Sequence, residues 1–329
     1  MEADFAVAQH PDEQGLVFAY GFDADGSARI ATEGSAWIWK SYSLTDGRAR
    51  RRIEQHPALP EPVRQMLLSG ADACHLDYDD GWLHGDLPDI AHEHYSDIRQ
   101  IGHFRFAAND AILLSGRRQP LKSIEAIRQG LERGMRKAKS PLALVEQIMG
   151  QSLDQLRADI GKAAEMLDRI EDQVVGDRWH GEREALTAVR RDAVALTRQV
   201  ATVTQIFRHL DQAHDDDLPQ TVSDMASRLS ARALALHHDC EQLQSRARLL
   251  QDELLAKLTA QSNRLLYFLS VLTAVLLPMT IVSGLFGMNV GGIPFAEGPA
   301  GFWIVSALAI AAALSVLYLV TRAGRSRGP

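Results

Sequence analysis

The longest uncharged stretch of the chain lies near its C-terminus and constrains the fold more than any other feature. No charged side chain occurs from Leu265 to Met288, and a second uncharged run extends from Gly301 to Thr321. A helix rises about 1.5 Å per residue, so each run can cross a hydrocarbon layer of about 30 Å. We therefore expect two membrane-spanning helices, at about residues 265–288 and 301–321.

The charges that flank these two runs predict an orientation. Lys257 and Arg264 precede the first run and three arginines follow the second, whereas the connector at residues 290–300 has no Lys or Arg. Positive flanks stay on the cytoplasmic side of a membrane. The first fifteen residues have neither the basic nor the apolar region of a signal peptide. We expect a multi-pass membrane protein with both termini in the cytoplasm.

Composition excludes several classes of protein. The 329 residues carry a net charge of −7 and no basic patch with interleaved aromatic residues, which argues against nucleic acid as a partner. The two cysteines, Cys74 and Cys240, are far apart and suit free thiols in a reducing compartment. No glycine-rich phosphate loop, GxSxG or HExxH motif occurs, so neither an enzyme nor a tightly bound cofactor is expected.

Residues 1–140 have the pattern of a cytoplasmic α/β domain. Pro60 and Pro62 open a predicted helix that ends at Leu68, and a second helix within residues 117–139 is expected to begin at an N-cap, Ser123. The stretch at residues 72–89 predicts a loop that contains one strand. Further strands are predicted at residues 16–21, 36–42, 101–107 and 111–115.

Residues 141–262 show the three-and-four spacing of apolar side chains that is typical of amphipathic helices. Two long helices are predicted, separated by a break at residues 176–181. A third begins near Val222, where large residues recur every seven positions beside a row of small residues. No proline or glycine interrupts it before the first span, so one continuous helix of about sixty residues should enter the membrane.

The fold class is therefore an α+β membrane protein. An α/β domain is followed by a helical stalk and a transmembrane hairpin. The predicted domain bounds are 1–140, 141–262 and 263–325.

One face of the first span carries small, hydroxyl and amide side chains, completed by two leucines. Such a face meets either another helix or a pore that several copies of the helix enclose. Spacing alone leaves both open. Neither span contains Asp, Glu, Lys, Arg or His, so the path would be lined by hydroxyls and carbonyls. The predicted pore-lining residues are Asn263, Leu266, Ser270, Thr273, Leu277, Thr280 and Gly284.

A motif ends the first span. Gly287, Met288 and Asn289 follow LLPMTIVSGLF and precede VGGIP. This tripeptide, at the outer end of the first of two C-terminal spans, resembles the signature of the CorA superfamily of divalent-cation transport proteins. VGGIP and the preceding QSNRLLYFLSVLTAVLLP are similar to the ZntB zinc-transporter branch. The resemblance is dense over residues 249–295 and weaker in the α/β domain, where WIWKSYSL departs from the family's W-x-H-L-D.

The resemblance implies a homopentamer in a bacterial cytoplasmic (inner) membrane. Its first spans would line a pore, and the long helix would continue as the wall of a cytoplasmic funnel. Asn289 would present five amides to a hydrated cation at the outer mouth, and Gly287 would allow a close backbone turn. Zn²⁺ is the implied cargo, with Mg²⁺, Co²⁺, Ni²⁺ and Cd²⁺ as other candidates. Oxygen ligands suit hydrated Mg²⁺, whereas Zn²⁺ prefers nitrogen or sulfur, so zinc rests on the resemblance alone.

Two alternatives stay open. One is a Mg²⁺/Co²⁺ channel of the same superfamily. The other is a non-conducting, membrane-anchored coiled-coil scaffold or sensor, in which the polar face of the first span serves packing alone.

Two groups of residues could bind a metal in the cytoplasmic part. His92 and His94 flank Glu93, and acidic residues and further histidines lie nearby in the sequence. Solvated surface is the alternative. His237 and Cys240 lie one helical turn apart, and a packed thiol is the alternative there. The residues near the first group are Asp72, Asp77, Asp79, Asp80, His84 and His103.

Overall fold

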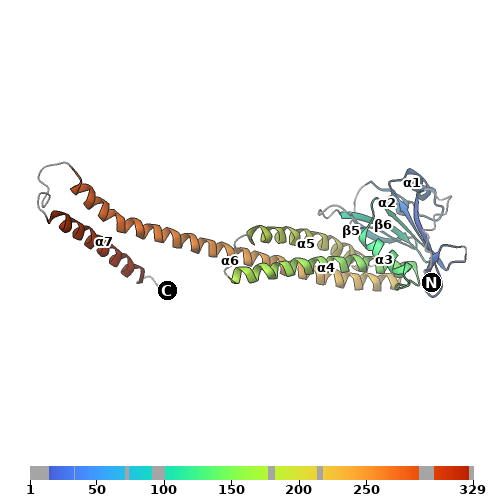
Figure 1. Ribbon diagram of the computed structural model, residues 1–329. Helices are drawn as coiled ribbons and strands as arrows, with labels where there is room; N and C mark the ends of the chain where they lie inside the picture. The colour runs from blue at the N-terminus through green and yellow to red at the C-terminus, as the bar shows by residue number, and fades with distance from the viewer. Residues whose placement is uncertain are drawn as a thin grey trace. The chain divides into compact units, whose positions relative to one another are not determined.

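The computed structural model describes residues 15–32, 34–70, 74–90, 101–176, 182–212, 218–288 and 300–325 (Figure 1). The chain divides into two compact units between Arg248 and Leu249. Helix α6 (Gln220–Phe286) contributes residues to both units and confirms the expectation of one long helix. The predicted boundary at residue 262 concerns where the membrane begins, and it stays a prediction.

The first unit contains a seven-stranded sheet with the strand order β2-β1-β3-β7-β6-β5-β4. Neighbouring strands are antiparallel except β3 and β7, which are parallel. The four strands predicted outside residues 72–89 are confirmed to within two residues at each end. The strands are β1 (Leu16–Phe22), β2 (Ala28–Ile30), β3 (Trp37–Ser43), β4 (His75–Asp79), β5 (Trp82–Ile90), β6 (Ile101–Ala108) and β7 (Ile112–Arg117).

The expectation of one strand within residues 72–89 is wrong, because β4 and β5 form a hairpin there. Its turn residues, Asp80 and Gly81, both have positive φ angles, of 48° and 79°. An Asp-Gly pair favours this kind of two-residue turn, whose twist matches that of antiparallel strands. The short strand β2 was not expected from the sequence.

Two short helices, α1 (Gly47–Glu54) and α2 (Glu61–Leu68), cover one face of the sheet. The bounds of α2 match the prediction, and α1 was missed although Asp46 caps it by accepting a hydrogen bond from the backbone N–H of Arg48. Ile53 and Val63 from the helices are buried against Leu114 of the sheet. Burial of these apolar side chains holds the layer in place.

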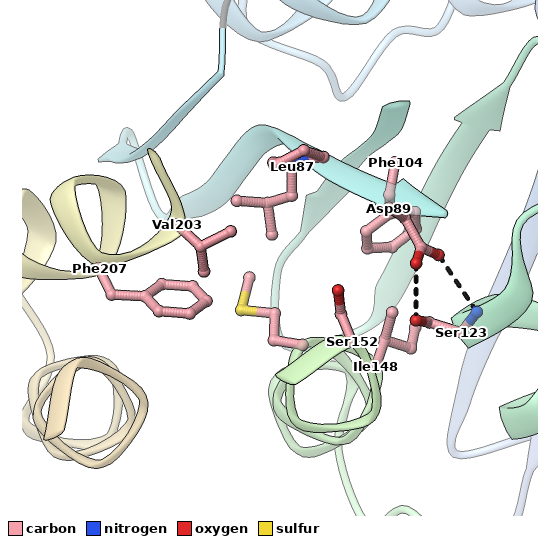
Figure 2. A pocket seen from close by; sticks show the side chains of 10 residues that line it. Leu87, Asp89, Phe104, Ser123, Ile148, Ser152, Val203 and Phe207 are labelled. Atoms are coloured by element: carbon pink, nitrogen blue, oxygen red, sulfur yellow. Dashed lines mark hydrogen bonds between the residues drawn. The ribbon is translucent and has the colours of Figure 1, made fainter. Parts of the chain in front are cut away.

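The opposite face of the sheet packs against helix α3 (Lys122–Glu132) and the stalk helices (Figure 2). The prediction that Ser123 is the N-cap of α3 is wrong, because Leu121 occupies that position. The hydroxyl of Ser123 instead donates to Oδ1 of Asp89 at 2.8 Å, and its backbone N–H donates to Oδ2 at 3.2 Å. A carboxylate from strand β5 therefore takes the part that a cap would play.

The predicted stalk helices are present as α4 (Pro141–Val175), α5 (Glu182–Gln212) and the first part of α6. Arg228 and Arg246 of α6 pair with Glu146 and Asp168 of α4, in the same order along both helices, so α4 and α6 run parallel. Apolar rows fill the space between the helices. The buried residues of α6 include Val222, Ala226, Leu229, Ala233, Leu236, Cys240, Leu243, Ala247 and Leu250.

The second unit contains the rest of α6 and helix α7 (Gly301–Arg325). Both helices pass the length and composition criteria for crossing a membrane. Pro278 lies inside α6 and has no N–H to donate to the carbonyl one turn earlier. The two predicted apolar helices are therefore confirmed as helices.

The stalk packing leads to a stability prediction. Leu167 of α4 is fully buried, whereas its neighbour Met166 is 45% exposed. Leu167→Ala should cost about 2–5 kcal/mol, because it leaves a cavity between the helices. The melting temperature of the full-length protein in detergent, followed by tryptophan fluorescence, should fall by about 5–15 °C. Met166→Ala should change it little, and equal shifts for both variants would contradict this packing.

Candidate functional site

The polar face of the first span lies on α6, and its own chain leaves it uncovered. All seven predicted pore-lining residues are exposed, and Leu266 and Leu277 expose 58% and 56% of their surface. They recur at intervals of three and four residues, so they form one line along the helix. We call these seven residues, Asn263 to Gly284, the polar stripe.

The hydroxyl groups of the polar stripe are satisfied within the helix. Ser270 donates to the carbonyl oxygen of Leu266 at 2.8 Å, and Thr273 donates to that of Leu269 at 2.9 Å. Thr280 donates to the carbonyl of Leu277 at 2.8 Å. Each hydroxyl has thereby used its one proton, and its oxygen keeps lone pairs that can accept a hydrogen bond from water. The stripe thus presents acceptors, which suit the water shell of a cation.

A different face of α6 meets α7. Near the end of α6, Val282 and Phe286 line a pocket together with Gly301 and Val305 of α7. From Val271 onward, the other half-buried residues of α6 recur on the same side as these two. They are Val271, Ala274, Val275, Pro278 and Met279. The second span therefore covers this side of α6 and leaves the polar stripe open.

The helix ends at the tripeptide motif. The N–H of Gly287 donates to the carbonyl of Ser283 at 2.9 Å, and a Cβ at Gly287 would lie 3.0 Å from that oxygen. A side chain at Gly287 would therefore make a tight contact with this carbonyl. Met288 is 53% exposed. Asn289 lies outside the described residues.

The acidic and histidine residues of the sheet are mostly engaged with each other. His84 is buried and lies 2.9 Å from Oδ2 of Asp79, and His103 lies 2.7 Å from Oδ1 of Asp86. His92, His94 and Asp72 lie outside the described residues. In the part of the chain that the structure describes, no group of three or more His, Cys, Asp or Glu side chains is arranged to hold a metal ion.

Sequence reasoning missed the centre of this network, which is the buried carboxylate of Asp86. Arg105, also buried, donates its Nε to Oδ2 of Asp86 at 2.9 Å and also binds the carbonyl of Ser69. The guanidinium of Arg105 thus neutralises the carboxylate of Asp86, so this carboxylate does not need a metal ion to balance its charge. The alternation of polar residues in strands β5 and β6 is the signal that could have paired them.

The geometry at His237 and Cys240 favours a packed thiol. Cys240 is fully buried against α5, and burial raises the pKa of its thiol to about 11. Nε2 of His237 lies 3.6 Å from Glu241, one turn further along the helix. A metal ligand needs a thiolate, which burial disfavours here.

Comparisons with known proteins agree with this architecture. Residues 34–322 match the family model described as CorA-like Mg²⁺ transporter protein. The divalent cation transporter CmaX of Pseudomonas aeruginosa is 26% identical over 310 residues, which cover 90% of this chain and 92% of that protein. The zinc transport protein ZntB of Yersinia enterocolitica is 27% identical over 297 residues, covering 87% and 88%.

Solved structures agree as well. The structure of full-length CmaX has a TM-score of 0.77 and 26% identity, and covers 94% of this chain and 98% of its own. The CorA magnesium transporter of Methanocaldococcus jannaschii has a TM-score of 0.74 at 16% identity, covering 94% and 97%. The second likeness, at this low identity, supports the fold alone.

The burial of Cys240 gives a prediction for thiol chemistry. Iodoacetamide at pH 8 should modify the half-buried Cys74 of the native full-length protein and leave Cys240 unmodified. At a pKa of about 11, only about one Cys240 thiol in a thousand is a thiolate at that pH. Mass spectrometry of tryptic peptides gives the two extents separately. In denaturant both should react, and equal native rates would contradict the burial.

Proposed function

Because this chain belongs to the CorA-like Mg²⁺ transporter family, we propose that it carries divalent cations across a membrane along the polar stripe of α6. The observation that supports this most is that α7 covers a different side of the helix. Packing within the chain therefore does not account for the stripe. A chain with two spans cannot enclose a path by itself, so the proposal requires several copies, and we propose five.

Hydrated cations would meet oxygen acceptors along this path. Ser270, Thr273 and Thr280 would face the axis with their lone pairs, and leucines between them would form apolar constrictions. Five Asn289 amides would make the first contact at the outer mouth. Divalent cations such as Mg²⁺ lose water reluctantly, so this lining suits an ion that keeps most of its water shell.

The proposed cargo is Zn²⁺, with Mg²⁺ as the second candidate. The ZntB relative at 27% identity supports zinc, whereas the CmaX relative is named only for divalent cations. The description of the family model and the oxygen chemistry of the stripe favour Mg²⁺. Co²⁺, Ni²⁺ and Cd²⁺ belong in the same assay.

The proposed orientation places both termini in the cytoplasm. Lys257 and Arg264 before the first span and Arg322 after the second would lie on that side, and the connector at residues 290–300 on the other. In this orientation the sheet and the stalk are cytoplasmic.

Cation flux into proteoliposomes tests the role of the motif. Asn289→Ala removes all the proposed amides at once, and we expect uptake of ⁶⁵Zn²⁺, and of Mg²⁺ reported by a fluorescent probe, to fall at least tenfold. Loss of the amides removes the hydrogen bonds that hold the hydrated ion, each worth about 1 kcal/mol. Equal flux for the wild type and this variant at matched protein density would contradict the proposed role of the motif. Flux in neither would favour the non-conducting scaffold.

A second substitution tests the polar stripe. Thr280→Val keeps the shape of the side chain and removes its oxygen, and we expect flux to fall about fivefold for the loss of one hydrogen bond per copy. Ser315→Ala is the matched control, because this serine lies on α7 and its hydroxyl donates to the carbonyl of Ala311. The control should keep wild-type flux. A loss of flux in the control equal to that of Thr280→Val would contradict the assignment of the path to α6.

A further inference from the structure

A polar pocket of about 400 Å³ lies within the first unit, at one edge of the sheet. One wall is the outermost strand, β4, with His75 and Leu76, and Cys74 just before it. The other wall is the face of α5 formed by residues 202–212. Leu76 and Ile206 are buried at the base, where the two walls meet. Pockets of this volume commonly hold small molecules.

The wall from α5 carries a positive charge that the chain leaves unpaired. Within the described residues, the guanidinium of Arg208 has neither a hydrogen bond nor an ion pair, although the chain has a net charge of −7. By contrast, Arg228, Arg232 and Arg246 of α6 each pair with a carboxylate of α4. A guanidinium presents parallel N–H groups that match the oxygens of a carboxylate or a phosphate. Arg208 therefore offers the pocket an unused fork of donors.

Other donors line the same pocket. The side-chain amide of Gln205, one turn before Arg208, likewise has no partner among the residues that the structure describes. His209 adds an imidazole from α5, and His75 adds one from the opposite wall. Asp77 lies 4.0 Å from Nε2 of His209, but no carboxylate is among the described residues that line the pocket. A permanent positive charge and several N–H donors suit an anion and disfavour a metal cation.

We propose that this pocket binds a small oxyanion, a molecule whose phosphate or carboxylate group pairs with Arg208. The volume leaves room for an organic part beyond the charged group. Gln205 and the two imidazoles would donate to further oxygens of the same molecule. The site lies wholly within the first unit and does not depend on the proposed transport.

Isothermal titration calorimetry of the full-length protein in detergent, in metal-free buffer of constant ionic strength, tests the site. The probes are inorganic phosphate, ATP and citrate, which separate phosphate from carboxylate ligands. We expect at least one probe to bind at one site per chain, and Arg208→Gln to weaken its binding at least tenfold, because a charge-assisted pair is lost. Arg208 is exposed, so its substitution should leave the fold unchanged.

Arg191→Gln is the matched control for the loss of charge. Arg191 is exposed on the same helix and does not line the pocket. It lies about 25 Å from Arg208 along α5, at about 1.5 Å per residue. This variant loses the same charge and should bind the probe like the wild type.

The thiol of Cys74 reports whether the probe occupies this pocket. Cys74 is half-buried and lines the pocket. A saturating concentration of the bound probe should slow its modification by iodoacetamide at least fivefold in the wild type and in Arg191→Gln. The same concentration should give no protection in Arg208→Gln. In denaturant the probe should leave the rate unchanged, which controls for a direct effect on the reagent.

The outcomes decide the proposal without any measurement of ion flux. Binding that Arg208→Gln weakens and Arg191→Gln keeps, together with protection of Cys74, supports the site. No binding of any probe overturns it, and so does equal weakening in both variants. Binding without protection of Cys74 places the anion elsewhere and also overturns it. Each of these failures leaves the proposed transport standing, and an absence of flux leaves the anion site standing.

Discussion

A helix in hydrocarbon must satisfy its own polar groups, and this requirement explains the design of α6. The hydroxyls of Ser270, Thr273 and Thr280 each bond to a carbonyl of the preceding turn, so the helix can carry oxygen atoms along one side without an unsatisfied donor. In the first unit the requirement is to bury apolar side chains, because water there satisfies the polar groups and apolar burial provides the stability. There the same helix buries rows of Leu and Ala against α4 and α5.

One helix can meet both requirements because its faces have different partners. The leucine and alanine rows contact the stalk, and the side with Val282 and Phe286 contacts α7. The seven residues of the polar stripe, from Asn263 to Gly284, are exposed and keep intervals of three and four. Seven-residue spacing of this kind favours association of the helix with copies of itself, since such a line stays straight only when helices supercoil.

Periodicity made the long elements of this fold predictable. The stalk helices, the long helix and both apolar helices follow from spacing, and Pro60 and Pro62 locate α2 to the residue. Strand β2 has three residues and α1 has eight, which is too short for a periodic signal. The hairpin of β4 and β5 was missed because the turn pair Asp80-Gly81 was interpreted as part of a loop.

The candidate site also has a part that could be predicted from the sequence and a part that could not. The polar stripe was predictable because it lies on a regular helix, whose spacing places residues on a face. The pairing of Asp86 with Arg105 was not, because strand register depends on the hairpin that was missed. His84 and His103 were grouped by their nearness in sequence, but the sheet gives each its own carboxylate partner.

The link between Asp89 and Ser123 has a consequence for how the first unit opens. The carboxylate belongs to the sheet and the two donors belong to the first turn of α3, so the end of the helix cannot fray without separating a buried charge from its partners. Ends of helices normally exchange their amide hydrogens by local fraying. Here the amide of Ser123 should exchange only when the sheet itself opens, which makes α3 and strand β5 one cooperative unit.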